Sequence, residues 1–316
     1  MPAIVTHHLF GSQVYDKLRI VIGVGEVERQ AFLLGNIGPD PLFCMKLLPK
    51  KLPFRNLGTT MHRQDPARLL AAFHDSFIKN TSGKHHGACK AFALGFLCHY
   101  LLDSTVHPLV NAQKCAYCAA GGNDLPIKLV GGSVHALIET ELDEYLLTKT
   151  LGVSVKTFVP SKEILICPDQ ELNAISRCFA KGATRAYGYR VPDWLYLSSV
   201  HAYRTAQHAL DSKRSGLRSH IDYAQLVGKH YLHVQALSHN AGLRSETPFA
   251  NDDHLPFPHP YEEGKVVDDS FDDLYQRAFT RALDAVPRYV QASFSAVDCA
   301  VLSDGINFGG KRVEHA

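Results

Sequence analysis

The chain lacks the sequence features that place a protein in or across a membrane. No apolar run in its 316 residues reaches the roughly 18 residues that a membrane span needs. The first residues, Met1 to His7, lack the basic region and apolar stretch of a secretory signal peptide. An excess of one charge is also missing, since the formal net charge is +2 and no block of Lys or Arg stands out. We therefore expect a soluble, cytoplasmic protein with no duplex nucleic acid as a partner.

Signals for β-strands and disulfides are equally scarce. The best strand candidates, residues 156–159 and 164–166, are short and bounded by proline. In a reducing cytoplasm the eight cysteines should be free thiols that act mainly as small core residues. Cys115 and Cys118 form a single CxxC pair, which could be a redox pair or half of a structural zinc site. Without a second such pair we interpret it as incidental.

Periodic apolar segments instead predict an all-α protein, a multi-helix bundle. Asp65 and Pro66 mark one helix start, Ser133 is a plausible cap for another, and Pro108 should end the central helix near Val106. We expect residues 1–160 to form a metal-binding helical core and residues 161–316 to pack on it as further helices of the same domain. A boundary near residues 150–165 remains an alternative. The helices are expected near residues 10–35, 66–79, 88–106, 133–149, 168–187, 194–213, 219–240 and 268–298, and the loops at 36–64, 109–132 and 241–267.

What the chain has in abundance is histidine, 18 residues in all, and three ligand-type side chains stand in one apolar segment. His99, Asp103 and His107 follow at steps of four residues, which places them on one face of a helix. Their neighbours are almost all apolar, so the helix should be buried. Because buried carboxylates and imidazoles are costly unless they are paired or bound to metal, this stretch predicts a metal site. Structural ion pairs would bring no gain over apolar packing.

Four other segments carry ligands of matching chemistry. His135 and Glu139 repeat the step of four on the following helix, with Asp143 on the same face as a possible partner of His135, and Asp40 lies in the turn Gly38-Pro39-Asp40-Pro41. His62 and His7 complete the set. Nitrogen and oxygen ligands without thiolates are typical of catalytic zinc. A helix rise of about 1.5 Å per residue separates His99 from His107 by about 12 Å, too far to share one ion. Asp103 between them could bridge two metals, which favours a cluster.

These residues, in this order, resemble the zinc-dependent phospholipase C family, in particular its phospholipase C/D-type domains. The resemblance covers residues 1–150 and rests on Thr6-His7-x-x-Phe10-Gly11, Gly38-Pro39-Asp40, His62, His99-x3-Asp103-x3-His107 and His135-x3-Glu139. It implies a helical fold that holds two or three zinc ions and hydrolyses phosphate esters. The implied ligand sets are Asp40, His62, His99 and Asp103 for one ion; His107, His135 and Glu139 for a second; and His7, Asp103 and the chain's own N-terminus for a third.

The chain departs from the secreted members of this family at two points. Its spacing from Asp103 to His107 is shorter, and Pro2, exposed by removal of Met1, would stand where those proteins have a Trp. The resemblance implies a phosphodiesterase that uses metal-activated water, with Asp40 orienting or deprotonating that water. The substrate would be a phosphodiester, including a phospholipid at a membrane surface.

Two other functions remain open at this stage. One is a zinc-dependent nuclease acting on single-stranded nucleic acid or nucleotides, and the other is a non-catalytic zinc-binding scaffold. We interpret His8 as exposed and idle, and the adjacent His74 and Asp75, which resemble the signature of HD-type phosphohydrolases, as a solvated polar pair. The remaining C-terminal histidines are interpreted as parts of helix faces: His201, His208, His220, His230, His233 and His239. The sequence does not indicate an oligomeric state.

Overall fold

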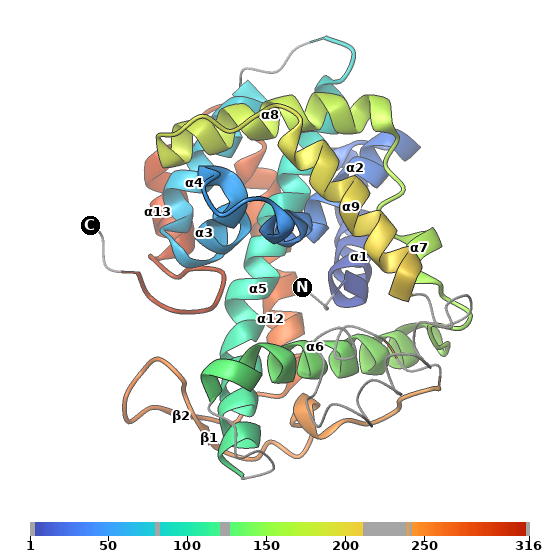
Figure 1. The fold of residues 1–316 in the computed structure, drawn as a ribbon, viewed down its shortest axis with the longest axis vertical. Helices are drawn as coiled ribbons and strands as arrows, with labels where there is room; N and C mark the ends of the chain where they lie inside the picture. The colour runs from blue at the N-terminus through green and yellow to red at the C-terminus, as the bar shows by residue number, and fades with distance from the viewer. Residues whose placement is uncertain (1–3, 80–82, 121–126, 211–238, 240–241, 314–316) are drawn as a thin grey trace. The chain divides into compact units, whose positions relative to one another are not determined.

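The structure is a computed structural model that describes residues 4–79, 83–120, 127–210, 239 and 242–313. Helices dominate the described residues, and the two short strands form one antiparallel pair, so the prediction of an all-α protein is confirmed. Figure 1 shows the elements, which in chain order are α1 (Ile4–Ile22), α2 (Glu26–Ile37), η1 (Asp40–Leu47), η2 (Pro53–Asn56), α3 (Leu57–Arg63), α4 (Pro66–Phe73), the π-helix η3 (His74–Lys79), α5 (His86–Ala119), α6 (Ile127–Leu151), α7 (Pro160–Glu163), α8 (Asp169–Tyr187), α9 (Leu195–Leu210), η4 (Pro248–Ala250), β1 (Phe257–Pro258), β2 (Val266–Val267), α12 (Phe271–Tyr289) and α13 (Ala296–Ser303).

The chain divides into two compact units that are each discontinuous in sequence. Unit 1 comprises Met1–Thr6, Val106–Glu163 and Thr205–Tyr275, and unit 2 comprises His7–Thr105, Ile164–Arg204 and Gln276–Ala316. The expected division into a core of residues 1–160 and added helices of residues 161–316 stays a prediction. No helix in the described residues is long and apolar enough to span a membrane.

Helix α5 corrects the expectation that Pro108 ends the central helix. The helix continues past this proline to Ala119. Proline removes one backbone hydrogen bond and is therefore disfavoured in the interior of a helix. Here Leu109, Val110 and Ala112 are all buried beyond Pro108, so apolar packing outweighs that local cost. His107 therefore lies inside α5, one turn after Asp103, and not at a helix exit.

Other predicted boundaries also differ from the structure. The segment 10–35 is two helices, broken at Gly23 to Gly25, and 268–298 is likewise divided between α12 and α13. The expected loop 36–64 contains η1, η2 and α3, and the two strand candidates are not strands, because the strand pair lies at 257–258 and 266–267. Helix α6 begins six residues before Ser133, which is therefore not its cap. The expected helix 219–240 falls almost entirely outside the described residues.

In unit 2, α2 and α5 cross at a pair of glycines. A Cβ on Gly35 would stand 2.2 Å from the carbonyl oxygen of Phe92, and one on Gly95 would stand 2.0 Å from that of Phe32. The two backbones are thus in direct contact, which only glycine permits. The crossing brings the C-terminal end of α2 against the middle of α5. It is surrounded by a buried aromatic core that includes Phe73, Phe92, Phe96, Phe179 and Tyr196.

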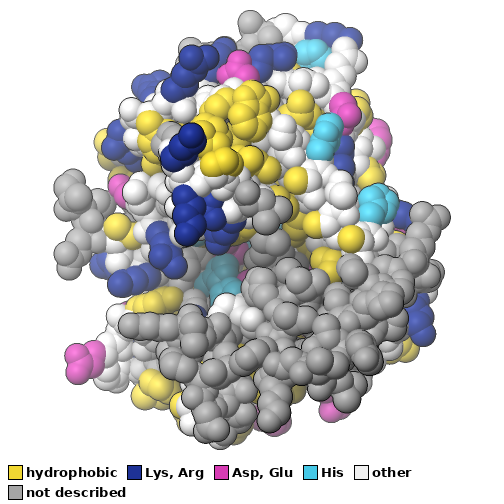
Figure 2. All heavy atoms as spheres, in the orientation of Figure 1, with side chains coloured by type: hydrophobic (Ala, Val, Ile, Leu, Met, Phe, Trp, Pro, Cys, Tyr) yellow, Lys and Arg dark blue, Asp and Glu magenta, His cyan; other side chains and the backbone are white. Residues whose placement is uncertain are grey.

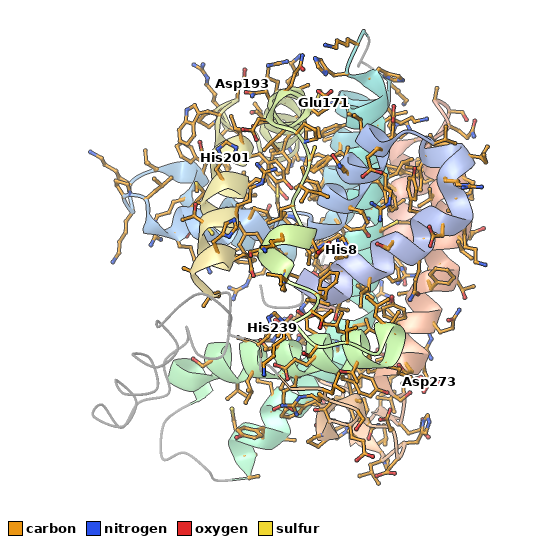
Figure 3. All side chains as sticks on the ribbon, turned by 90° about the vertical axis from the view of Figure 1, so that its right-hand side faces the viewer. His8, Glu171, Asp193, His201, His239 and Asp273 are labelled. Carbon is orange, nitrogen blue, oxygen red and sulfur yellow. The ribbon has the colours of Figure 1, made fainter. Side chains whose placement is uncertain are left out.

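In unit 1, a buried carboxylate on α6 holds the beginning of α1. Asp143 is fully buried and accepts hydrogen bonds from the backbone N–H groups of Val5 (3.1 Å) and Thr6 (2.8 Å). These are first-turn amides, which have no partner within their own helix. His239, labelled in Figure 3, lies 3.0 Å from the same carboxylate through Nε2. Since both carboxylate oxygens bind these groups, the role suggested for Asp143 as a partner of His135 is not the one that the structure shows.

Candidate metal centre

Each unit contains ligand-type side chains that converge. In unit 2 the convergent sets are His7, Asp40 and His99, and His62, His99 and Asp103; in unit 1 the set is His107, His135 and Glu139. In each set the candidate ligand atoms lie within 4.8 Å of one another. The structure thus brings together all eight residues singled out from the sequence, as members of one set or another. Their role as metal ligands stays a proposal.

His99 is the most buried of these side chains, with 0% of its surface exposed. Its Nδ1 donates a hydrogen bond to the carbonyl oxygen of Asn36 (2.9 Å), one of the last carbonyls of α2. Gly38 follows with φ of +57°, and a Cβ there would lie 2.5 Å from the His99 ring. The turn therefore wraps around the imidazole. Because a carbonyl can only accept, the proton sits on Nδ1 and the lone pair of Nε2 is left to bind a metal.

His62 is fixed in the same way by its own helix. Its Nδ1 donates to the carbonyl oxygen of Gly58 at 2.7 Å, one turn earlier in α3. Its Nε2 lies 3.3 Å from Asp40 Oδ1 and 3.7 Å from Asp103 Oδ2. Two imidazoles from different helices thus present Nε2 toward the same carboxylates, each held by a backbone carbonyl behind it. That arrangement is typical of metal-binding histidines.

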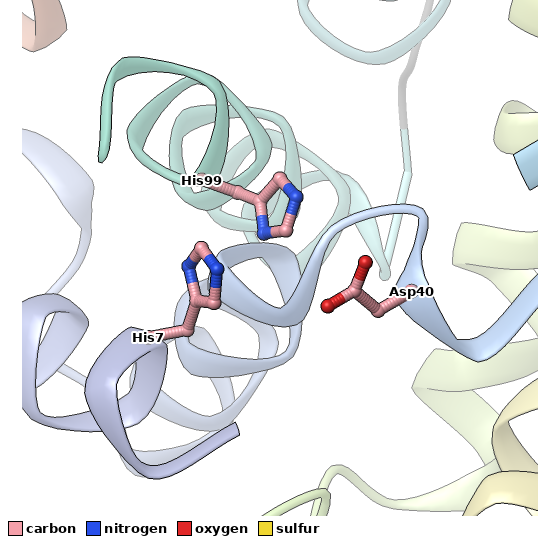
Figure 4. A group of neighbouring side chains, drawn as sticks. All are labelled: His7, Asp40 and His99. Atoms are coloured by element: carbon pink, nitrogen blue, oxygen red, sulfur yellow. The ribbon is translucent and has the colours of Figure 1, made fainter. Parts of the chain in front are cut away.

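Asp103 faces different imidazoles with its two oxygens. Oδ1 lies 3.2 Å from His7 Nε2, and Oδ2 lies 3.3 Å from His99 Nε2. The rings of His7 and His99 stack with centroids 4.2 Å apart, as can be followed in Figure 4. Burial, followed by the charge of His99, lowers the pKa of His7. For His99 burial is the largest single influence and acts in the same direction, but the interactions with Asp103, the charge of Asp40 and the Asn36 carbonyl together outweigh it and raise the pKa.

Asp40 lies at the start of η1 and is 4% exposed. Burial alone would raise the pKa of this carboxyl, but nearby positive charge and the hydrogen bond from His62 lower it below its usual range. Tyr196 supports the turn by donating its hydroxyl to the carbonyl oxygen of Gly38 at 2.8 Å. Asp40 is therefore a buried, ionised carboxylate, directed toward His7 and His99 (Figure 4).

The set in unit 1 is built on the later part of α5 and on α6. Glu139 Oε1 lies 3.4 Å from His107 Nε2 and 3.1 Å from His135 Nε2. The two imidazoles are nearly parallel, at 15°, with centroids 5.4 Å apart. Burial lowers the pKa of His135. Burial is the largest single influence and opposes ionisation of Glu139, but the charge of His135 and the other positive groups and imidazole contacts together outweigh it, and the pKa of Glu139 falls well below its usual range.

The distances fit zinc better than they fit hydrogen bonds between the side chains. Ligand atoms at about 2.0–2.1 Å from a tetrahedral zinc lie about 3.3–3.4 Å from one another. The imidazole–carboxylate separations in both units are 3.1–3.7 Å. His99 Nε2 is buried and makes no hydrogen bond, although Asp103 is only 3.3 Å away. His7 Nδ1 is also buried without a hydrogen-bond partner. The donor set therefore fits zinc.

Two histidines that sequence analysis placed at the surface are buried. His8 is 8% exposed, and burial together with the charge of Arg29 lowers its pKa to about 4. His74 is 1% exposed and donates from Nε2 to the carbonyl oxygen of Gln291 at 3.0 Å. Asp75 next to it pairs with Lys79 and Arg185. His74 is therefore a structural histidine of the core, and not a metal-binding histidine of the kind found in HD-type phosphohydrolases.

The other sequence candidates have no metal-site geometry among the described residues. Cys115 and Cys118 lie near the end of α5, in helix and not in a loop, and neither joins a convergent ligand set there. None of the eight cysteines, all of which lie in the described residues, takes part in a disulfide there. His201 pairs with Asp169 at 3.0 Å, whereas His220, His230 and His233 lie outside the described residues.

The sequence carries no signal for the backbone groups that orient the imidazoles. The carbonyls of Asn36 and Gly58 carry no side-chain signal, and only the crossing of α2 with α5 shows which carbonyl meets His99. Gly38 belongs to the turn Gly38-Pro39-Asp40-Pro41, which the sequence did indicate, but its close approach to the His99 ring appears only in the structure.

The chain matches one known protein family. The profile of the family described as zinc dependent phospholipase C matches residues 6–184, which is more than half of the chain. The chain belongs to this family. The match begins just before His7 and ends after Glu139, so it includes all eight candidate ligands. No curated protein and no solved structure matches the chain.

Proposed function

We propose that this protein is a zinc-dependent phosphodiesterase of phospholipase C type. The observation that carries the proposal is the convergence of five side chains in unit 2, four of them buried, with Nε2 of His62 and His99 directed toward carboxylates by backbone carbonyls. Family membership supports a hydrolase that depends on zinc. The substrate class that fits both the ligand geometry and the family membership is a phosphodiester, including a phospholipid.

The proposed ligands are the eight residues of the convergent sets, holding two or three zinc ions. Asp103 would bridge two ions, because its two oxygens face His7 on one side and His62 and His99 on the other. Neutral imidazoles bind metal, and the carbonyls behind His62 and His99 hold them in the tautomer that leaves Nε2 free. A third ligand set would need the amine of Pro2, which lies outside the described residues.

When bound, zinc supplies Lewis acidity, which lowers the pKa of a coordinated water and neutralises charge on the phosphoryl group. Asp40 is the proposed group that orients the attacking water and accepts its proton. It is held ionised by the positive charge around it, so it can accept a hydrogen bond at neutral pH. The backbone of its turn is fixed by Tyr196, which keeps the carboxylate in one position.

Metal analysis together with turnover of a small phosphodiester tests this proposal. Asp103→Asn should lose at least one zinc per chain and lower turnover by at least about a hundredfold, because it removes a shared ligand. The matched control is Asp16→Asn, the same change at an exposed position of α1. This variant should keep the zinc content and the turnover of the wild-type protein. Full zinc content and full activity in Asp103→Asn would contradict the bridging role, and fewer than one zinc in the wild-type protein would refute the centre.

Parallel assays on phosphatidylcholine and single-stranded DNA decide the substrate class. Cleavage of the phospholipid supports the proposal. Cleavage of DNA alone would favour the alternative of a zinc-dependent nuclease. Zinc binding with no hydrolysis of any phosphodiester would favour a non-catalytic scaffold.

A further inference from the structure

A stretch of unit 2 next to the metal centre carries positive charge and no negative charge. Residues 41–64, which we call the cationic segment, contain no Asp or Glu. They run through η1, η2 and α3, between Asp40 and Asp65. The five cations of the segment are spread over 18 residues, so they form no block in the sequence. They are Lys46, Lys50, Lys51, Arg55 and Arg63.

These cations have no acidic partners within the described part of the chain. Lys46, Lys50, Lys51 and Arg63 are exposed, and Arg55 is half-buried. Elsewhere in the unit, arginines meet carboxylates, as in the pairs Arg185–Asp75, Arg204–Asp169 and Arg312–Asp304. Burial, and then the charges of Arg63 and Arg55, lower the pKa of Lys46. Lys46, Arg55 and Arg63 therefore repel one another, and an anion bound there would relieve the repulsion.

Apolar and aromatic side chains stand among these cations. Trp194, immediately before α9, is 48% exposed and packs edge-on against Phe54 of η2, with ring centroids 5.8 Å apart. Phe43 lies under the Lys46 ammonium, 4.6 Å from its ring centroid. Leu52 is half-buried nearby in sequence. On the face shown in Figure 2, Lys and Arg side chains gather beside an apolar patch over the region of α3 and the start of α9.

The cationic segment also borders the candidate ligands. It begins directly after Asp40 and contains His62, and the rings of Phe43 and His62 are 5.0 Å apart. A ligand bound across the segment would thus lie next to the metal centre of the same unit.

We propose that the cationic segment and Trp194 form a docking surface for anionic phospholipid membranes. Lys and Arg side chains attract the negative headgroups, and a half-exposed Trp is suited to the interface between headgroups and acyl chains. Asp193, labelled in Figure 3, is an exposed acid beside Trp194 and marks an edge of this surface. Docking is a property of the surface and does not depend on the proposed hydrolysis.

A membrane fits these residues better than a single-stranded nucleic acid. Single-strand binders stack successive bases on several exposed aromatic rings. Here Phe54 is buried, and Trp194 is the exposed ring beside the segment. One exposed aromatic ring among cations and apolar side chains is instead the composition of an interfacial anchor.

Trp194 is the only tryptophan of the chain, so intrinsic fluorescence reports directly on this surface. Zinc-loaded protein is mixed with vesicles of phosphatidylcholine alone, or of phosphatidylcholine and phosphatidylserine. We expect a blue shift of the emission and co-flotation with the anionic vesicles, quenching by brominated acyl chains, and loss of binding at high salt. The absence of both the shift and flotation would overturn the proposal. Tighter binding of oligothymidylate than of anionic vesicles would also overturn it, in favour of a nucleic-acid surface.

A pair of matched variants tests whether binding to anionic vesicles depends on the position of the lysines or only on the total charge of the protein. Lys50→Gln with Lys51→Gln should weaken binding to anionic vesicles by about 25-fold, since each basic residue near an anionic surface contributes about fivefold. The control, Lys84→Gln with Lys181→Gln, removes two exposed lysines outside the segment and should keep wild-type affinity. Equal weakening in both variants would refute a defined surface. Because vesicle binding is measured without turnover, a catalytically inactive protein that still docks would contradict the proposed hydrolysis alone.

Discussion

At the scale of the residue, single buried polar side chains position whole elements of this protein. Asp143 satisfies two first-turn amides of α1 and also binds His239, all within unit 1. His74 fixes the backbone at Gln291 from the interior of unit 2. Neither residue belongs to a convergent ligand set among the described residues. Their effects should therefore be on stability and not on metal content.

Asp143→Ala should destabilise the protein by about 3 kcal/mol, because it leaves buried amides without the charged acceptor that binds them. Asp143→Asn keeps one acceptor oxygen and should cost less. Urea unfolding of both variants measures the difference. A loss below about 1 kcal/mol in the alanine variant would show that the carboxylate does not anchor α1.

His74 should make stability depend on pH. Burial lowers its pKa in the folded protein below the ordinary value of 6.5. The unfolded chain then binds the proton more readily, so this contribution to stability is present at pH 7 and is lost as the pH falls below about 6.5 toward the lowered pKa. His74→Gln should be less stable than wild type at pH 7, and the gap should narrow at pH 5. Unfolding free energies at both pH values test this, and a gap independent of pH would contradict it.

At the scale of the element, the crossing of α2 with α5 determines where His99 lies. The contact through Gly35 and Gly95 places the last carbonyls of α2 against α5, where the carbonyl of Asn36 accepts from His99. The sequence predicted α5 as the ligand-bearing helix from its apolar neighbours and its steps of four residues. It could not predict the partner helix, because the glycines that allow the crossing give no periodic signal.

Gly95→Ala should destabilise the protein by at least about 3 kcal/mol, because the added methyl group would lie 2.0 Å from a backbone oxygen that cannot rotate away. Gly132→Ala is the matched control, since nothing lies within 4 Å of a Cβ on this helical, exposed residue. That variant should gain about 0.5–1 kcal/mol. Thermal unfolding measures both, and a Gly95→Ala variant as stable as wild type would contradict the close crossing.

At the scale of the whole molecule, candidate ligand sets occur in both units. Each set draws on helices that are distant in sequence, so zinc should hold those helices together. Metal that binds only the folded state stabilises it by mass action.

Removal of zinc with an excess of chelator should therefore lower the Tm by several degrees, and zinc added back should restore it. In Asp103→Asn the shift should be smaller, because one site is weakened. Differential scanning calorimetry of the zinc-loaded and chelated proteins measures the shift. An unchanged Tm in a protein shown to have lost its zinc would contradict a structural contribution of the metal.

The sequence by itself determined the helical class and the identity of the candidate ligands. The helical class follows from apolar periodicity, and the ligands of the two longest helices follow from steps of four residues, which any α-helix converts into one face. His135 with Glu139, and His99 with Asp103, were predictable for this reason. Asp40, His62 and His7 were singled out by residue type and by the family resemblance.

Only the tertiary structure decided the remaining features, because each depends on contacts between segments far apart in the chain. Because of apolar packing, α5 continues past Pro108, and His8 and His74 are buried. Packing also places a backbone carbonyl of α3 against His62 and one of α2 against His99. It also brings Trp194 against Phe54 of the cationic segment, a contact between residues 140 positions apart in the chain.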